Sequence, residues 1–129
     1  MVKHVETPKP SEGELEILQI LWKKKSATVR EVYEEISLIK DCGYTTTLKL
    51  MQIMYEKHLV TRDNSQKTHL YAPNISKENT QKQLLGKIVH TLFSGSTSQL
   101  VLQALGSGKP SPDELEQIEA MLTRLKNAQ

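Results

Sequence analysis

The stretch YTTTLKLMQIMYEKHLVTRDNSQKTHLYAP, residues 44–73, decides the fold because its hydrophobic period changes half-way along. Its first half predicts a helix over about 45–58, with Thr45 or Thr46 as the N-terminal cap. Apolar and small side chains recur there at helical spacing. They form one continuous inner face, made of Thr47, Leu50, Met51, Met54 and His58.

The second half of the stretch predicts a β-hairpin. Short strands are expected at about 59–62 and 69–72, and the polar residues 63–68 connect them. Pro73 ends the second strand, because proline has no backbone N–H to donate to a neighbouring strand.

Two helices are predicted before this stretch. Ser11 and Glu14 have the spacing of a capping box ahead of the first helix, and Thr28 caps the second, which is expected to stop around 41–43. Three helices followed by a hairpin are the order of elements in a winged helix-turn-helix. In that arrangement the third helix lies in the major groove of DNA and the hairpin, or wing, contacts the backbone.

Residues 76–129 predict three more amphipathic helices. Ser76 caps the first, which Ser94-Gly95 ends, and Ser96 with Gln99 is expected to form a capping box for the second. A break at Gly106-Ser107-Gly108 precedes the last helix. That helix begins with Ser111, Pro112 and Glu114, which supply the cap, a first-turn proline and the partner of the cap.

These C-terminal helices predict dimerisation, because about 50 residues bury too little surface to form a second independent core. Packing against a second copy covers their apolar faces; the alternative is packing onto the chain's own first three helices. The predicted fold is thus mostly α with a small β-hairpin wing: a winged helix-turn-helix DNA-binding domain (1–75) followed by a helical dimerisation region (76–129). The predicted dimerisation residues are Leu84, Leu85, Ile88, Leu92, Phe93, Leu100, Val101, Leu105, Leu115, Ile118 and Leu122.

The outer face of the third helix and the wing carry the residue types that contact DNA. Lysine and glutamine side chains match guanine, adenine or phosphate, and threonine or isoleucine can meet a thymine methyl group. The alternative is an ordinary amphipathic surface helix with solvated charges. The predicted DNA-binding residues are Thr45, Thr46, Lys49, Gln52, Ile53, Arg62 and Lys67.

Composition argues against several other classes. The 129 residues have a net charge of +2 and contain no apolar run long enough for a membrane span or a signal peptide, so a cytoplasmic protein is expected. His4, His58, His69 and His90 lack metal-ligand spacing, and the single Cys42 has no specified catalytic partners. Neither an enzyme nor a metal or other cofactor is therefore predicted. The remaining functional alternative is a winged helix that binds proteins without sequence-specific DNA binding.

The chain resembles the BlaI/MecI/CopY repressors over essentially its whole length. The resemblance rests on the run from Tyr44 to Met54, on Lys57-His58-Leu59-Val60 with Arg62, and on the opening Glu14–Leu18 with Leu21-Trp22. It implies a winged-helix homodimer that represses transcription by binding inverted-repeat operators. In that family the regulated genes commonly encode β-lactamases, penicillin-binding proteins or copper exporters.

The chain departs from the family pattern near the expected DNA contacts. The family usually has glycine where this chain has His58, Gly-Arg where it has Gln66-Lys67, and an arginine where it has Ile53. Lys67 can still reach a phosphate, but as a point charge without the planar fork of arginine. The change at Ile53 leaves the operator sequence open.

Two further departures concern signalling. Copper-responsive members carry a C-terminal cysteine cluster that binds Cu(I), and this chain has no cysteine there, so copper sensing of that type is not supported. Penicillin-responsive members are cleaved at an Asn-Phe bond in the dimer region, where this chain has Gln103-Ala104. A membrane sensor protease stays open as a partner, whereas induction specifically by penicillin is not supported.

Overall fold

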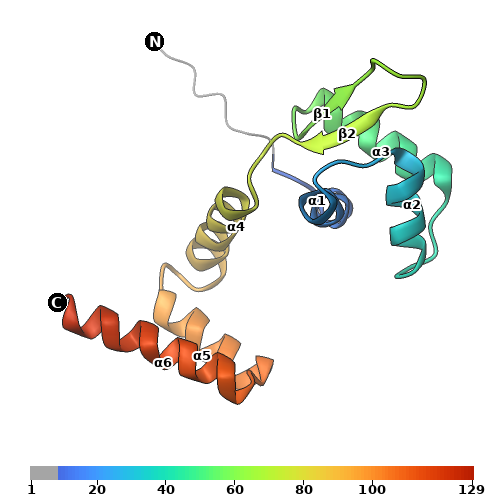
Figure 1. Cartoon of the computed structure of the whole chain (residues 1–129). Helices are drawn as coiled ribbons and strands as arrows, with labels where there is room; N and C mark the ends of the chain where they lie inside the picture. The colour runs from blue at the N-terminus through green and yellow to red at the C-terminus, as the bar shows by residue number, and fades with distance from the viewer. Residues whose placement is uncertain (1–8) are drawn as a thin grey trace, which may run out of the picture. The chain divides into compact units, whose positions relative to one another are not determined.

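The structure is a computed structural model that describes residues 9–129 (Figure 1). It confirms a mostly helical chain with one small hairpin. The elements in order are α1 (Glu12–Lys24), α2 (Val29–Ser37), α3 (Tyr44–Glu56), β1 (Val60–Asp63), β2 (Leu70–Pro73), α4 (Lys77–Leu92), α5 (Thr97–Gly108) and α6 (Pro112–Asn127). They form two compact units, the first extending to Gln81 and the second covering Lys82–Gln129, and each is described by itself.

The capping box predicted at the start of α1 is present. The Ser11 N–H donates to Glu14 Oε1 over 2.8 Å, and the Glu14 N–H donates back to Ser11 Oγ over 3.2 Å. Thr28 and Glu31 make the same reciprocal pair at the start of α2. These bonds satisfy backbone donors that have no partner within the helix, so both helices begin where the sequence indicates.

The second helix ends earlier than predicted. It stops at Ser37 rather than around 41–43, because its buried stripe ends at Ile36. Beyond that residue, the N–H groups of Leu38 and Ile39 bond three residues back, to Glu35 and Ile36, in a tightened last turn. The side chains of Leu38 and Ile39 are exposed, so no burial favours another helical turn.

The third helix begins one residue before the first of the predicted caps. Gly43 is the N-cap, and the hydroxyl of the buried Thr47 donates to the Gly43 carbonyl over 3.3 Å. Thr45 and Thr46 therefore lie in the first turn with exposed side chains, not at the cap. The assignment of His58 to the inner face is also wrong. It lies past the end of α3, exposed, with φ of +64°, where the chain turns into β1.

The hairpin pairs Val60 with Pro73 and Arg62 with Tyr71, and both strands begin one residue later than predicted. A third segment joins it, which the sequence did not indicate. Ala27, in the connection between α1 and α2, exchanges two backbone hydrogen bonds of 2.9 Å with Tyr71. The base of the wing is thereby joined to the segment that leads into α2.

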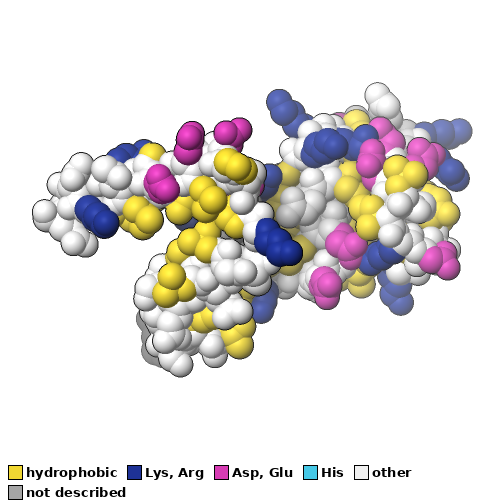
Figure 2. Space-filling view, turned by 90° about the horizontal axis from the view of Figure 1, so that it is seen from below, with side chains coloured by type: hydrophobic (Ala, Val, Ile, Leu, Met, Phe, Trp, Pro, Cys, Tyr) yellow, Lys and Arg dark blue, Asp and Glu magenta, His cyan; other side chains and the backbone are white. Residues whose placement is uncertain are grey.

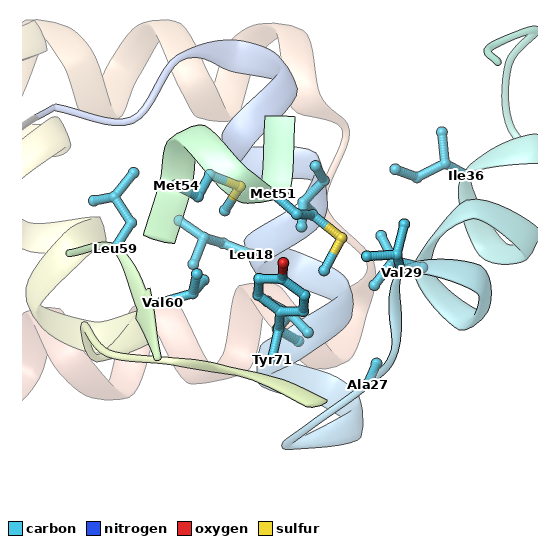
Figure 3. Packing of buried hydrophobic residues seen from close by; sticks show 12 residues of the cluster. Leu18, Ala27, Val29, Ile36, Met51, Met54, Leu59, Val60 and Tyr71 are labelled. Atoms are coloured by element: carbon cyan, nitrogen blue, oxygen red, sulfur yellow. The ribbon is translucent and has the colours of Figure 1, made fainter. Parts of the chain in front are cut away.

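The core of the first unit lies between α1, α2, α3 and the hairpin. In Figure 3 the ring of Tyr71 lies in a cluster that includes Leu18, Met51 and Val60, all at most 2% exposed. At its edge the Trp22 indole N–H donates to the Ile75 carbonyl over 2.9 Å, which holds the start of the chain beyond the hairpin against α1. This core fixes α3 so that only its outer side faces solvent.

In the second unit the last cap is present as predicted and two other details differ. Ser111 and Glu114 form a full capping box at α6. Ser96 accepts from the Gln99 N–H, but the reciprocal bond expected from Gln99 is absent. The predicted break at 106–108 is wrong, because α5 continues to Gly108 and ends at Lys109 in the left-handed conformation.

Candidate nucleic-acid interface

The predicted DNA-binding residues of α3 lie on its solvent side. Thr45, Thr46, Lys49 and Gln52 are exposed, and Ile53 is half-buried. Residues 45, 49 and 52 fall within one helical face, opposite the buried Thr47, Met51 and Met54. The helix therefore presents hydroxyl, ammonium and amide groups outward.

A groove of about 680 Å³ runs along one edge of this surface, between α2, α3 and the hairpin. It brings together three of the predicted residues from separate elements: Gln52, Arg62 and Lys67. Thr45, Thr46, Lys49 and Ile53 do not line it, so the predicted set divides into a groove part and an outer-face part. Gln52 borders both.

Arg62 is held in place by two neighbours. Its guanidinium carbon lies 4.2 Å from the centroid of the Tyr55 ring, and its Nε donates to Asn64 Oδ1 over 2.9 Å. A stacked guanidinium is attracted by the negative face of the ring and loses rotational freedom. Its two terminal NH₂ groups make no hydrogen bond with the described residues.

Arg30 makes a similar stack at the other end of α3. Its guanidinium carbon lies 5.4 Å from the centroid of the Tyr44 ring. Tyr44 in turn packs edge-on against Tyr33, with ring centroids 5.6 Å apart. Arg30 and Tyr44 both line the groove, and neither was among the predicted site residues. Their pairing joins α2 to α3, and nothing in the local sequence pattern shows it.

The tip of the wing is ordered by its own polar groups. The Ser65 N–H donates to Asp63 Oδ1 over 2.9 Å, and this hydrogen bond from the backbone is the main cause that lowers the pKa of Asp63. Lys67 follows with an exposed side chain, as a phosphate contact requires.

Lys57, the residue that caps the end of α3, forms an ion pair inside the protein. Its ammonium donates to both oxygens of Glu14 over 3.1 Å, and Glu14 is 1% exposed. Burial raises the pKa of Glu14, but hydrogen bonds from the Ser11 N–H and the Lys57 ammonium outweigh it. The net pKa lies below its usual value. Lys57 therefore positions the end of α3 against α1.

The apolar side chains predicted for dimerisation lie at or near the surface of α4, α5 and α6 (Figure 2). α5 and α6 bury no side chain. Two apolar hollows lie in this unit: one of about 350 Å³ includes Leu85 and Val101, and one of about 510 Å³ includes Ile118 and Leu122. Further exposed apolar residues, outside the predicted dimerisation set, are Leu102, Met121 and Leu125.

Within residues 9–129 no three His, Cys, Asp or Glu side chains gather as metal ligands, and His4 lies outside the described residues. Cys42 is half-buried with its Sγ 3.9 Å from Thr47 Oγ1. None of the helices in this part of the chain is long and apolar enough to cross a membrane.

Comparison with known proteins decides the family, because residues 10–124 match the family model described as penicillinase repressor. The chain belongs to the penicillinase repressor family. It is 25% identical over 112 residues to the penicillinase repressor of Staphylococcus aureus, covering 87% of this chain and 89% of that protein. It is 36% identical over 64 residues to the transcriptional regulator BlaI of Mycobacterium tuberculosis, covering 47% and 46% of the two chains.

Solved structures of penicillinase repressors confirm the winged-helix fold. The DNA-binding domain of the repressor BlaI superimposes with a TM-score of 0.52 at 24% identity, covering 57% of this chain and 90% of that domain. The Bacillus licheniformis BlaI monomer, determined in complex with the blaP half-operator, gives a TM-score of 0.50 at 24% identity, covering the same shares of the two chains. Membership of the penicillinase repressor family confirms a DNA-binding repressor of transcription rather than an enzyme.

Proposed function

We propose that this repressor is a homodimer that binds an inverted-repeat operator through α3 and the hairpin. The observation that carries the proposal is the groove beside α3, whose lining includes Gln52 of the helix together with Arg62 and Lys67 of the hairpin. An amide beside two cations suits base recognition next to a phosphate backbone. The Bacillus licheniformis BlaI monomer, which shares this fold, was solved in complex with the blaP half-operator.

Within this proposal the residues have different tasks. The residues that face bases in the major groove are Thr45, Thr46, Lys49, Gln52 and Ile53. Arg62 and Lys67 contact phosphates. We place the DNA-binding domain at 1–75 and the dimerisation region at 76–129.

The dimer rests on the apolar surface of α4, α5 and α6. Leu92 is 74% exposed and Leu102 70%, and both hollows of this unit are lined mainly by apolar side chains. Monomeric soluble proteins rarely expose contiguous apolar patches of large area. A second copy of the same helices covers them, and a two-fold axis then presents two α3 helices to two half-sites about one helical turn, or a multiple, apart.

Binding to an operator requires the cytoplasm, where we place the protein. A membrane sensor protease is a further partner that rests on the family resemblance alone. Gln103 and Ala104, which stand where penicillin-responsive members of the family are cleaved, are exposed on α5 in a single chain.

A mobility-shift titration tests the proposal. The probes are the DNA immediately upstream of the protein's own gene and an unrelated duplex of equal length, at about 150 mM salt because affinity depends steeply on salt. We expect a specific complex on the upstream DNA, and a duplex with one half-site removed to bind more weakly. Equal binding to both full-length probes contradicts sequence-specific recognition of that DNA and favours a winged helix that binds proteins.

A further inference from the structure

The chain has three arginines, and two of them stack on tyrosines at opposite ends of α3. Arg30 lies on Tyr44 in the first turn, and Arg62 lies on Tyr55 in the last. Eleven residues separate the tyrosines, which at 3.6 residues per turn places them on nearly the same side of the helix. The two stacks therefore border one edge of α3, with Leu48 and Gln52 between them on the groove.

Backbone pairing links the two arginines as well. Arg62 lies opposite Tyr71 in the hairpin, and Tyr71 pairs with Ala27, three residues before Arg30. Arg62 thus lies in the small sheet, and Arg30 lies three residues beyond the segment that pairs with it. Two further contacts hold the stacks in place. Tyr33 packs on the Tyr44 ring, and Asn64 Oδ1 accepts a hydrogen bond from Arg62 Nε.

We propose that Arg30 and Arg62 form a pair of DNA-phosphate contacts on either side of the base-reading part of α3, positioned by Tyr44 and Tyr55. The inference rests on the proposed DNA binding and adds to it one contact residue, Arg30, and two positioning residues. The tyrosines are about 16 Å apart along the helix axis at 1.5 Å per residue. The major groove is about 12 Å wide, so cations at both ends of an inserted helix come beside the two backbones that border it.

Arg30 does not pair with either of the carboxylates that line the groove, Glu31 and Glu34. Glu31 instead accepts the hydrogen bond from the Thr28 N–H. Arg30 makes no hydrogen bond or ion pair with the described residues, so its donors are available to a phosphate. Arginine suits this task because its planar fork binds phosphate bidentately while it stacks on a ring.

The test measures the affinity of the full chain for an unrelated 30-base-pair duplex between about 50 and 200 mM salt, so that it does not depend on knowing the operator. Each phosphate contact adds about 0.9 to the slope of log affinity against log salt. Arg30→Ala and Arg62→Ala should each weaken binding and reduce this slope by about 0.9. Between about 50 and 200 mM salt, the affinity of wild type should therefore fall by a factor about 3.5 times larger than that of either variant. Arg124→Ala, which removes the same charge from α6, is the matched control and should change neither quantity.

The positioning role needs a separate readout. Tyr44→Leu and Tyr55→Leu should weaken binding, and Tyr44→Phe and Tyr55→Phe should restore it, because phenylalanine keeps the ring face. Tyr44→Leu should add nothing to Arg30→Ala, and Tyr55→Leu nothing to Arg62→Ala. If Arg30→Ala binds with the affinity and slope of wild type, the Arg30 contact is refuted while DNA binding stands. If wild type binds no DNA at all, the proposed function fails first and the inference fails with it.

Discussion

The ammonium of Lys57 lies 3.1 Å from both carboxylate oxygens of Glu14, and so joins the residue that ends α3 to the first turn of α1. The two residues are 43 positions apart, yet Glu14 is almost fully buried and also accepts the Ser11 N–H. Its oxygens therefore satisfy a helix cap and hold the base-reading helix at the same time.

Lys57→Met should destabilise the protein by about 1–3 kcal/mol, because it leaves a buried acceptor without its charged donor. Urea denaturation measures this loss. Lys49→Met, on the exposed face of the same helix, is the matched control and should leave stability unchanged while weakening DNA binding. A drop in the salt slope of DNA binding for Lys57→Met equal to that of Lys67→Met would show that Lys57 contacts phosphate instead.

The Glu14 carboxylate should also make stability depend on pH. Its pKa in the folded state lies below the usual 4.5, so its contribution is present above about pH 4.5 and is lost as pH falls through the folded pKa. The free energy of unfolding of wild type minus that of Glu14→Gln should be constant between about pH 7 and 5 and shrink on further acidification. A difference that grows toward low pH contradicts this account.

His58 adopts φ of +64°, a conformation that costs a residue with a Cβ about 1–2 kcal/mol. His58→Gly should therefore stabilise the protein by about 0.5–1 kcal/mol after allowing for the greater freedom of glycine in the unfolded chain. The hydrogen bond from the Asn74 side chain to the His58 carbonyl involves only backbone at this position and is retained. Urea denaturation should also show that His58→Val is less stable than wild type. Equal stability of wild type, His58→Gly and His58→Val would show that the backbone at residue 58 is not strained.

Gln52 and Lys67 should respond differently to substitution by alanine. Gln52→Ala should relax sequence preference at one position of each half-site at a cost of about 1–3 kcal/mol, because an amide reads a base edge. Lys67→Ala should weaken binding to all sequences about equally and reduce the salt slope. Binding selections on randomised duplexes distinguish a loss of base preference from a uniform loss of affinity. An altered base preference for Lys67→Ala would show that Lys67 contacts a base and not the DNA backbone.

Leu122→Asp should convert the dimer to monomers and lower operator affinity, because it places a charge in the hollow beside Ile118. Ala120→Asp puts the same charge on the opposite side of α6 and should leave the dimer intact. Sedimentation velocity measures both. An intact dimer of Leu122→Asp places the interface elsewhere.

Local signals in the sequence predicted most of the fold. Ser11 with Glu14 and Ser111 with Glu114 mark helix starts, because the capping bonds span only three residues. The start of α3 was misplaced because Thr45 and Thr46 are both residues that commonly cap helices, whereas the buried Thr47 fixes the cap at Gly43 by donating to its carbonyl.

The parts of the candidate site that escaped prediction depend on contacts between distant segments. The stack of Arg30 on Tyr44 joins two helices, and the pairing of Ala27 with Tyr71 joins residues 44 positions apart. Neither contact produces a periodic pattern along the sequence from which it could be predicted. The outer-face residues of α3 were predictable in position because helical spacing assigns them opposite the core.

The bridge between Ala27 and Tyr71 separates the hairpin into a fixed base and an adjustable end. Residues 64–69 lie outside the paired strands, and their side chains are all exposed. We therefore expect insertions and deletions in this connection to alter how far the hairpin reaches along DNA while the core and the base-reading helix stay unchanged. The length of this connection and the sequence of α3 can then change independently in evolution, and either change alters which operator the protein binds.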